Sequence, residues 1–538
     1  MAGQTGGKTV VRSLFVRGSI ALTVSLWAMT AMANPPNADL LCAEEKLELT
    51  SDRFLRAVSF DLRGRPPTAG EVRVLRDSDD GEVPEWLIDH WLEDDAFAEQ
   101  VVRRHRAYLW NNITNTRLVN PNSDLGQRSG IYWVNRRANR YRPSPVDRPH
   151  CGDFPAEFDE DGRILTRMNA DDVPQEGYVE VSPYWAPETT IRVCAFDAQT
   201  TAVTSNGTPC NVRNGINNAE CGCGPNLVYC APGQFRTALK EAMGRSIELT
   251  IEAIIKDKEP YTNLFESQRF FVNGPMVHFY RHQAPGAQAL FTPSPVNLSL
   301  VPDIAAHERD RWIEMRVGQE HAGILTHPAF LMRFQTDRAR AATFYQEFLC
   351  GPFQPPAAGL PPADEEAARN PDLQERAGCK YCHSGLEPAA AHWGRWSEEG
   401  AGYINESDFP AEDPECVACA NGTGPCTSRC RTHYLTRTLS DQEDPYLGML
   451  KSFVFRRNEH MHHIDQGPKY LARAATADNR LPRCVAQQSA AWLLGRSLDR
   501  PGDAKWLTDL SVEFVQSGFD FRHLVKLIVT SDRYRRVQ

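Results

Sequence analysis

The sequence predicts a mainly α-helical protein in which a cysteine-rich insertion of loops and short β-strands separates several helical domains. Apolar residues recur at helical spacing over 51–113, over 235–256 and from 479 to the C-terminus. Between 114 and 233, by contrast, Pro, Asn, Gly and Cys are frequent and helical periodicity is absent. A chain of 538 residues with 41 % hydrophobic and 24 % charged residues is typical of a soluble protein of several domains.

The first 33 residues have the order of a secretory signal peptide. Three basic residues precede an apolar run from Ser19 to Met29, and Ala31-Met32-Ala33 supplies the small residues of a cleavage site. The apolar run is shorter than the roughly 20 residues of a membrane-spanning helix, so we expect an exported mature chain without a transmembrane segment. Cleavage after Ala33 leaves 56 basic and 69 acidic side chains, and this acidic balance argues against a nucleic-acid partner.

The first predicted helices lie between Ser51 and Ile113. Ser51 or Asp52 can cap a helix that ends at Gly64-Arg65-Pro66-Pro67, where glycine and proline interrupt the pattern. Thr68, followed three residues later by Glu71, has the spacing of a capping box that opens the next helix. Two further helices are expected over 86–92 and 97–110.

The insertion contains five cysteines between Cys194 and Cys230, together with short β-capable pieces at 177–181 and 189–196. These cysteines could form a second metal or redox centre, or they could staple the loops as disulfides. No histidine lies in the insertion after His150, and disulfides are common in exported loops. We therefore favour disulfides.

Two further groups of residues have the spacing of metal ligands. His278 and His282 stand four residues apart and could bind a metal on a helix, although such a pair is more often ordinary surface histidines. Four cysteines between Cys416 and Cys430 could bind zinc, but disulfides are favoured in an exported protein.

The most specific chemical signal is Cys379-Lys380-Tyr381-Cys382-His383. Two thiols at this spacing can add to the vinyl groups of haem, and the histidine that follows can bind iron from the proximal side. The alternative is a disulfide or a zinc half-site that precedes a histidine. We expect one covalent haem c, attached at Cys379 and Cys382, with His383 as the proximal iron ligand. The remaining thirteen cysteines are odd in number, so they cannot all pair within the chain.

The sequence specifies less clearly which residues lie on the proximal and distal sides of the expected haem. We expect the backbone carbonyl of Pro388 to accept a hydrogen bond from the second ring nitrogen of His383. A distal methionine would raise the reduction potential, a histidine would lower it, and an open position would permit peroxide chemistry. Met461 and His463 are the distal candidates that we favour. Other downstream candidates are His433, Met449, His460 and His462.

Four segments of the chain carry motifs that occur together in one type of protein. They are Leu62 to Thr68 (Leu-x-Gly-x-Pro-Pro-Thr), Ala322 to Leu331, the haem pentad with the later Gly394-Arg395-Trp396, and the C-terminal stretch that contains Gly518-Phe519-Asp520-Phe521. In these segments the chain resembles the planctomycete-type exported cytochrome c proteins, which are multidomain bacterial proteins built largely of domains of unknown function. The resemblance covers 51–113, 236–400 and 479–534, and it implies haem binding and electron transfer without naming a substrate. Glu387 stands where that family carries Asp.

We therefore predict an exported mono-haem c-type cytochrome-like protein of the periplasm or cell surface, which transfers electrons with a redox partner protein. A peroxidase-like haem enzyme with an open distal site, or a haem-stapled structural or binding module of a surface assembly, are the alternatives. No hydrolase, metalloprotease or phosphate-loop motif lies in a fitting context. The predicted parts are the signal peptide (1–33), an N-terminal helical domain (34–113), the insertion (114–235), a helical domain (236–350), a proline-rich linker with the haem segment (351–478) and a C-terminal helical domain (479–538).

Overall fold

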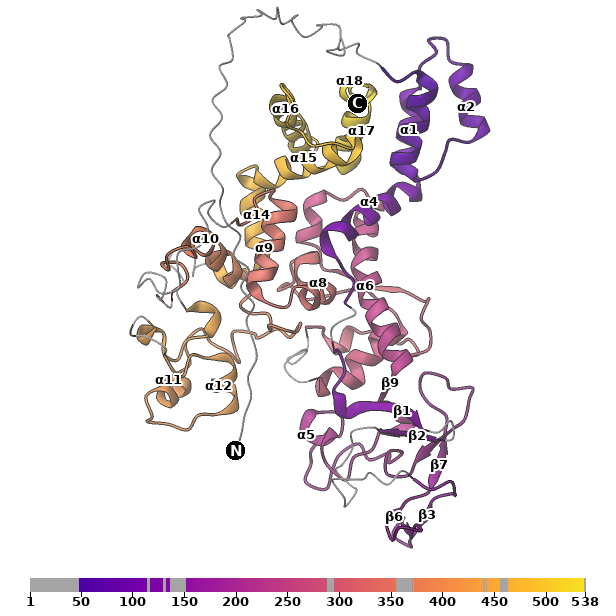
Figure 1. Ribbon diagram of the computed structural model, residues 1–538, viewed down its shortest axis with the longest axis vertical. Helices are drawn as coiled ribbons and strands as arrows, with labels where there is room; N and C mark the ends of the chain where they lie inside the picture. Colours follow the sequence, from indigo (N-terminus) through magenta and orange to yellow (C-terminus); the bar gives the residue numbers. More distant parts are fainter. Residues whose placement is uncertain are drawn as a thin grey trace, which may run out of the picture. The chain divides into compact units, whose positions relative to one another are not determined.

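The computed structural model describes residues 48–113, 117–128, 132–135, 151–287, 295–354, 370, 372–438, 441, 443–454 and 463–536 (Figure 1). Helices account for 48 % and strands for 10 % of the structure, which confirms the predicted mainly α-helical class. The predicted signal peptide lies outside the described residues. Among the helices of the described ranges, none combines the length and the apolar character that crossing a membrane requires.

In the described part of the chain before the insertion, from residue 48 onward, four helices form, as the apolar spacing predicts. Gly64, with a φ of 68°, ends the first helix in the left-handed conformation that glycine adopts readily. The predicted capping box opens the second helix, because the Glu71 amide donates to Thr68 Oγ1 and the Thr68 amide donates to Glu71 Oε2. The four helices are α1 (Ser51–Arg63), α2 (Ala69–Arg76), α3 (Glu85–Glu93) and α4 (Asp95–Leu109).

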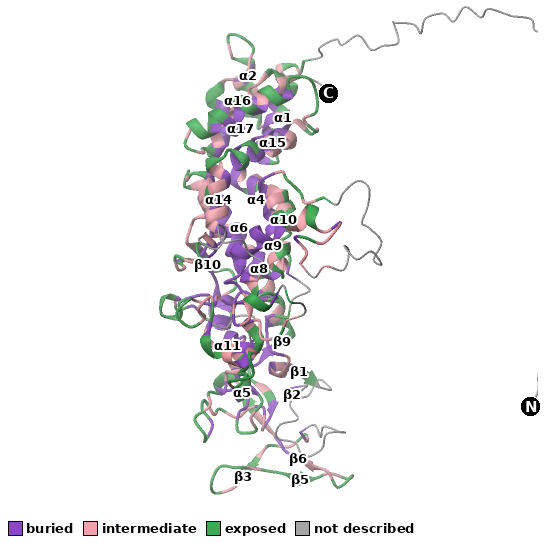
Figure 2. Cartoon of the chain, turned by 90° about the vertical axis from the view of Figure 1, so that its left-hand side faces the viewer, coloured by how far each residue is buried: buried purple, intermediate pink, exposed green. Residues whose placement is uncertain are grey.

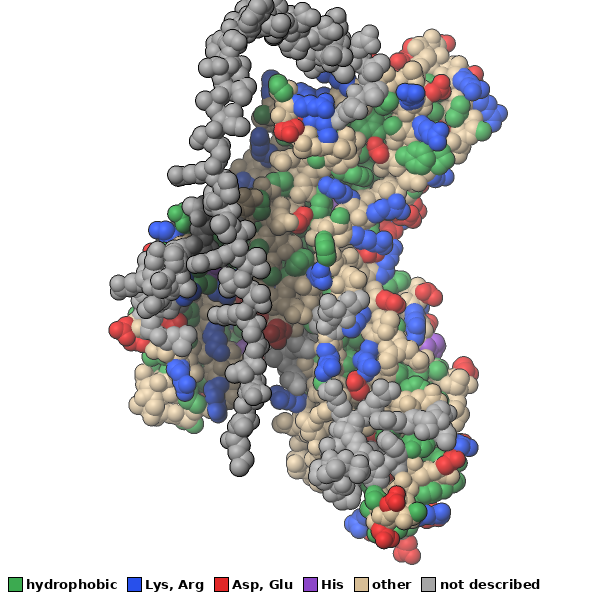
Figure 3. All heavy atoms as spheres, in the orientation of Figure 1, with side chains coloured by type: hydrophobic (Ala, Val, Ile, Leu, Met, Phe, Trp, Pro, Cys, Tyr) green, Lys and Arg blue, Asp and Glu red, His purple; other side chains and the backbone are tan. Residues whose placement is uncertain are grey.

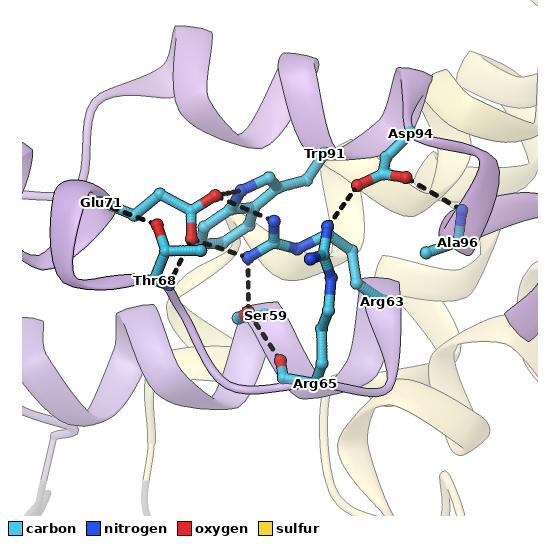
Figure 4. Close-up of polar contacts among 8 residues, drawn as sticks. All are labelled: Ser59, Arg63, Arg65, Thr68, Glu71, Trp91, Asp94 and Ala96. Atoms are coloured by element: carbon cyan, nitrogen blue, oxygen red, sulfur yellow. Dashed lines mark hydrogen bonds and ion pairs between the residues drawn. The ribbon is translucent and has the colours of Figure 1, made fainter.

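An ion pair between the buried Arg63 and the partly buried Glu71, together with Trp91, joins the first three of these helices (Figure 4). The Arg63 guanidinium donates to both carboxylate oxygens of Glu71 at 2.8 and 2.9 Å, and the Trp91 indole donates to Glu71 Oε1 at 2.8 Å. Arg63 also lies over the Trp91 ring, 4.2 Å from its centroid. Desolvation alone would raise the pKa of Glu71, but the hydrogen bonds from Arg63, the Thr68 amide and Trp91, with the Arg63 charge, lower it to about 2.

The cysteine-rich insertion is held by three disulfides, Cys151–Cys194, Cys210–Cys221 and Cys223–Cys230, which confirms the disulfide interpretation. Its largest sheet has the strand order β7-β8-β2-β1-β9, and two small hairpins pair β3 with β4 and β5 with β6. The strands and the short helix are β1 (Asp124–Arg128), β2 (Tyr132–Asn135), β3 (Glu157–Phe158), β4 (Ile164–Leu165), β5 (Arg167–Met168), β6 (Pro174–Gln175), β7 (Tyr178–Val181), β8 (Ile191–Cys194), α5 (Arg213–Ile216) and β9 (Ala231–Pro232).

The middle of the chain begins with α6 (Gly233–Lys256), the longest helix of the described residues. It packs against α4 on one side and against the two-stranded sheet of β10 and β11 on another. A turn at Gly323 needs glycine, because its φ is 52° and a Cβ atom there would lie 2.1 Å from the Leu264 carbonyl oxygen. The other elements are β10 (Arg269–Val272), α7 (Gly274–His278), β11 (Ile313–Arg316), α8 (Pro328–Arg333) and α9 (Asp337–Phe348).

The last third of the chain contains the predicted haem segment, a second disulfide-stapled piece and a group of C-terminal helices. Disulfides Cys416–Cys430 and Cys419–Cys426 staple the second piece, and Cys350–Cys484 links the end of α9 to the C-terminal helices. The helices are α10 (Lys380–Ala390), α11 (Pro414–Ala420), α12 (Ser428–His433), α14 (Pro468–Ala477), α15 (Arg480–Leu494), α16 (Asp503–Gln516), α17 (Phe521–Val529) and α18 (Asp532–Arg535).

One hydrophobic core runs through the helical segments. It includes Phe54 of α1, Ile251 of α6, Phe344 of α9 and Leu524 of α17. Figure 2 shows buried residues throughout this helical part, from α1 and α17 to α6 and α8. The predicted helical domains therefore share a single core, whereas the two cysteine-rich pieces have small apolar clusters of their own. On the visible surface, acidic and basic side chains are interspersed (Figure 3).

We expect Glu71→Gln to lower the free energy of unfolding by about 3 kcal/mol at neutral pH, because it leaves the buried Arg63 charge without its counter-ion. Since the pKa of Glu71 is depressed from 4.5 to about 2, its stabilisation is present above pH 4.5 and is lost as the pH falls toward 2. Chemical denaturation of wild type and variant should show a difference that narrows below pH 4.5. Asp79→Asn, on an exposed loop, is the control and should change little. A difference that stays constant down to pH 2.5 would contradict this account.

Candidate haem-attachment site

The pentad lies at the N-terminal end of α10. Cys379 is the N-cap residue with helical backbone angles, and the amides of Cys382 and His383 both donate to its carbonyl at 3.1 and 3.0 Å. The two thiols and the imidazole therefore occupy positions i, i+3 and i+4 of one helical turn, which share a helix face. This arrangement can present both sulfurs and the imidazole to the same ligand.

Cys379 and Cys382 are the free cysteines of the described residues, and both are partly exposed. The other twelve described cysteines form six disulfides. The thirteenth cysteine outside the pentad, Cys42, lies outside the described residues. Cys382 donates a weak hydrogen bond to the Gln354 carbonyl at 3.3 Å. Two unoxidised, accessible thiols beside a histidine are the donor set that covalent haem attachment requires, so these residues fit the group.

The ring orientation of His383 is set by Glu387, one helical turn later. His383 Nδ1 donates to Glu387 Oε1 at 2.6 Å, which leaves Nε2 as the nitrogen with a lone pair for a metal. The predicted acceptor, the Pro388 carbonyl, is therefore wrong for this hydrogen bond. Pro388 lies inside α10, where carbonyls point along the helix axis, whereas the Glu387 side chain shares a face with His383.

Glu387 is itself held by Arg338 of α9. Arg338 Nε donates to Oε1 at 2.5 Å and Nη2 donates to Oε2 at 3.2 Å, so the guanidinium and the imidazole share Oε1. The carboxylate is buried, while the Arg338 side chain is half exposed. The hydrogen bond from Arg338 to Glu387 raises the pKa of the guanidinium. The Glu387 carboxylate is thus charged, has a hydrogen-bond donor at each oxygen, and lies beside the Nδ1 edge of the His383 imidazole.

The residues after α10 anchor the segment to the core. The Trp393 indole donates to the Leu325 carbonyl at 2.9 Å, and Trp393 and Trp396 are both buried in the main core. Both tryptophans therefore pack in the protein core. Gly394 has no room for a side chain, because a Cβ atom would lie 2.4 Å from the Ser452 side chain.

A cavity of 390 Å³ opens beside Glu387. Arg338, Glu387 and Trp396 line it, together with His433 and Lys451 from the second disulfide-stapled piece. Burial, with the nearby Lys451 charge, lowers the pKa of His433. This distal candidate therefore lies on the Glu387 side of His383.

The other distal candidates are dispersed. Met449 packs against the apolar cluster around the Cys416–Cys430 disulfide. The His463 ring stacks on Tyr470 at 4.1 Å, and Tyr470 also stacks on His392, just beyond the C-terminal end of α10. The structure thus places His463 near the opposite end of α10 from the thiols. The remaining candidates, His460, Met461 and His462, lie outside the described residues.

The two other predicted metal-ligand groups have different roles. The four cysteines from Cys416 to Cys430 form two disulfides, as the sequence analysis predicts in preference to a zinc site. The His278 ring stacks on Tyr184, with 3.6 Å between the ring centroids, and its Nε2–H donates to the Val228 carbonyl. Burial lowers the pKa of His278 to about 3. Within the described ranges, no three His, Cys, Asp or Glu side chains are grouped as a metal site.

Comparisons with models of protein families, with curated proteins and with solved structures find no match to this chain. The resemblance to exported cytochrome c proteins therefore stays a prediction. The sequence analysis missed Glu387 as the partner of His383 and Arg338 as the partner of Glu387. The four-residue spacing of His383 and Glu387 fits one helical turn and could have indicated the first contact, whereas no local pattern indicates the second.

The test uses protein that is exported from cells without haem maturation and is then denatured without a reductant. In this protein we expect a thiol reagent to modify Cys379 and Cys382. Peptide mass spectrometry should find both alkylated, while the peptides of the six disulfides stay unmodified. A Cys379–Cys382 disulfide, or alkylation at Cys350 or Cys484, would contradict the cysteine assignment.

Proposed function

We propose that the chain is an exported c-type cytochrome-like protein that binds one haem covalently through Cys379 and Cys382, with His383 as proximal iron ligand, and transfers electrons. The observation that carries this proposal is that the thiols of Cys379 and Cys382 form no disulfide. In a chain whose other described cysteines are disulfide-bonded, the two that precede a histidine on one helical turn stay free. The six disulfides support maturation in an oxidising compartment, where c-type haem is also attached.

Bound haem would supply a one-electron couple at its iron. The chain's own residues would do the rest. The thiols would hold the group by two covalent bonds, and the hydrogen bond to Glu387 would keep the His383 ring turned with Nε2 available. The buried Trp393 and its bond to Leu325 would fix the helix that carries all three groups. A rigidly held haem suits electron transfer, which is fastest when the atoms around the redox centre move little.

Covalent attachment is tested by haem staining after denaturing electrophoresis and by pyridine-haemochrome spectra of protein exported with haem maturation. We expect a stained band in wild type, no stain in the Cys379→Ala/Cys382→Ala double variant, and a shifted haemochrome band in Cys382→Ala, where one vinyl group stays unreacted. Ser384→Ala, on an exposed neighbour in the same helix, should stain like wild type. An unstained wild type would refute the proposal.

A second candidate function, a peroxidase-like enzyme, is favoured by one observation. A carboxylate bonded to the proximal histidine increases electron donation to the iron, and electron-rich axial ligands favour cleavage of O–O bonds. The dispersed distal candidates do not favour electron transfer over this enzyme, because an open distal position permits peroxide chemistry. Electron transfer remains the primary proposal because it requires only the bound haem, whereas the enzyme would also need a site for its electron donor.

Hydrogen peroxide distinguishes the two functions. An electron carrier with both axial positions filled should keep its optical spectrum at micromolar peroxide and should not oxidise an added electron donor. Rapid spectral change with steady turnover of the donor would instead support the enzyme. The Cys379→Ala/Cys382→Ala double variant is the control, because a chain without covalent haem should show no such turnover.

A further inference from the structure

His383, Glu387 and Arg338 form a chain of groups that leads from the protein surface to the predicted iron ligand. The guanidinium is half exposed, the carboxylate is buried and the imidazole is partly buried. Arg338 Nε and His383 Nδ1 both donate to the same oxygen, Glu387 Oε1, at 2.5 and 2.6 Å. The two donors therefore compete for the negative charge of one carboxylate oxygen.

We propose that Glu387 and Arg338 are opposing positioning residues that set the reduction potential of an iron bound by His383. Glu387 lowers the potential, and Arg338 limits that effect. This inference rests on the proposed haem attachment and deepens it, because it names the groups that tune the same site.

The effect of Glu387 follows from charge. A carboxylate that accepts the Nδ1 proton gives the imidazole anionic character and makes Nε2 a stronger donor. A stronger donor stabilises the oxidised, more positive iron and lowers its reduction potential. Because Glu387 is buried, water screens this interaction little. A neutral carbonyl that accepted the same hydrogen bond, such as that of Pro388, would make Nε2 a weaker electron donor than the carboxylate does.

The effect of Arg338 has the opposite sign. Its bidentate contact neutralises part of the carboxylate charge, and Nε takes a share of the oxygen that His383 uses. Without the guanidinium, less of the Oε1 charge would be neutralised and the anionic character of the ring would increase. Arg338 is half exposed, so it can be replaced without opening a cavity in the core.

The experiment compares full-length, haem-loaded wild type with Glu387→Gln and Arg338→Gln in spectroelectrochemical titrations. We expect the midpoint potential to rise in Glu387→Gln and to fall in Arg338→Gln. Loss of structure around the helix would move both variants in one direction, so the opposite signs are the diagnostic result.

Glu398→Gln is the matched control. Glu398 lines the same cavity and acts on Arg338 through its charge, but it bonds to the Asp337 amide and not to His383. Its variant should keep the wild-type potential, and a shift as large as that of Glu387→Gln would overturn the inference in favour of bulk charge. Covalent haem is measured first in every sample. If wild type lacks it, the proposed function fails; if haem is present and the two variants shift together or not at all, this inference alone fails.

Discussion

The packing around the candidate site depends on one buried cation, Arg340 of α9. Its guanidinium has no exposed surface, and a charge buried without partners would cost several kcal/mol. The side chain is satisfied by the Asp337 carboxylate and by five backbone carbonyls, so these acceptors must remain in place together. The carbonyls belong to Leu331, Phe334, Trp396, Ser397 and Gly400. Three of them lie after α10, and Arg340 therefore fixes the exit of the candidate haem helix against α8 and α9.

This constraint explains how α9 serves both the core and the site. Residues two apart on a helix point about 200° away from each other, so Arg340 enters the core while Arg338 faces α10 and Glu387. The end of α9 is tied in turn to α15 by Cys350–Cys484, a crosslink over 134 residues that stabilises by about 5 kcal/mol through the unfolded chain. With the C-terminal end of α10 fixed in this way, its N-terminal turn can carry the two thiols at the surface.

Local patterns predicted from the sequence were reliable in this chain, and partners distant in sequence were not. The capping box of Thr68 and Glu71 could be predicted because both residues lie within one turn. The disulfide interpretation followed from composition and compartment, but the pairing needed the fold. For His383 the sequence analysis predicts the Pro388 carbonyl as acceptor, although Glu387, four residues later, has the better spacing on a helix. Arg338 lies 49 residues from Glu387, and no local pattern specifies that contact.

The helical core and the cysteine-rich pieces draw on different sources of stability, and this difference bears on the candidate site. Small apolar clusters such as that around Cys416 cannot stabilise a fold alone, and short disulfide loops of 7 and 14 residues each add about 2.5 kcal/mol or slightly more. Most of these cysteines are buried in the clusters that they staple. Cys379 and Cys382 instead stay accessible on a helix positioned by core contacts. On the proposed function, this separation lets twelve thiols oxidise in the same compartment in which two remain available for haem.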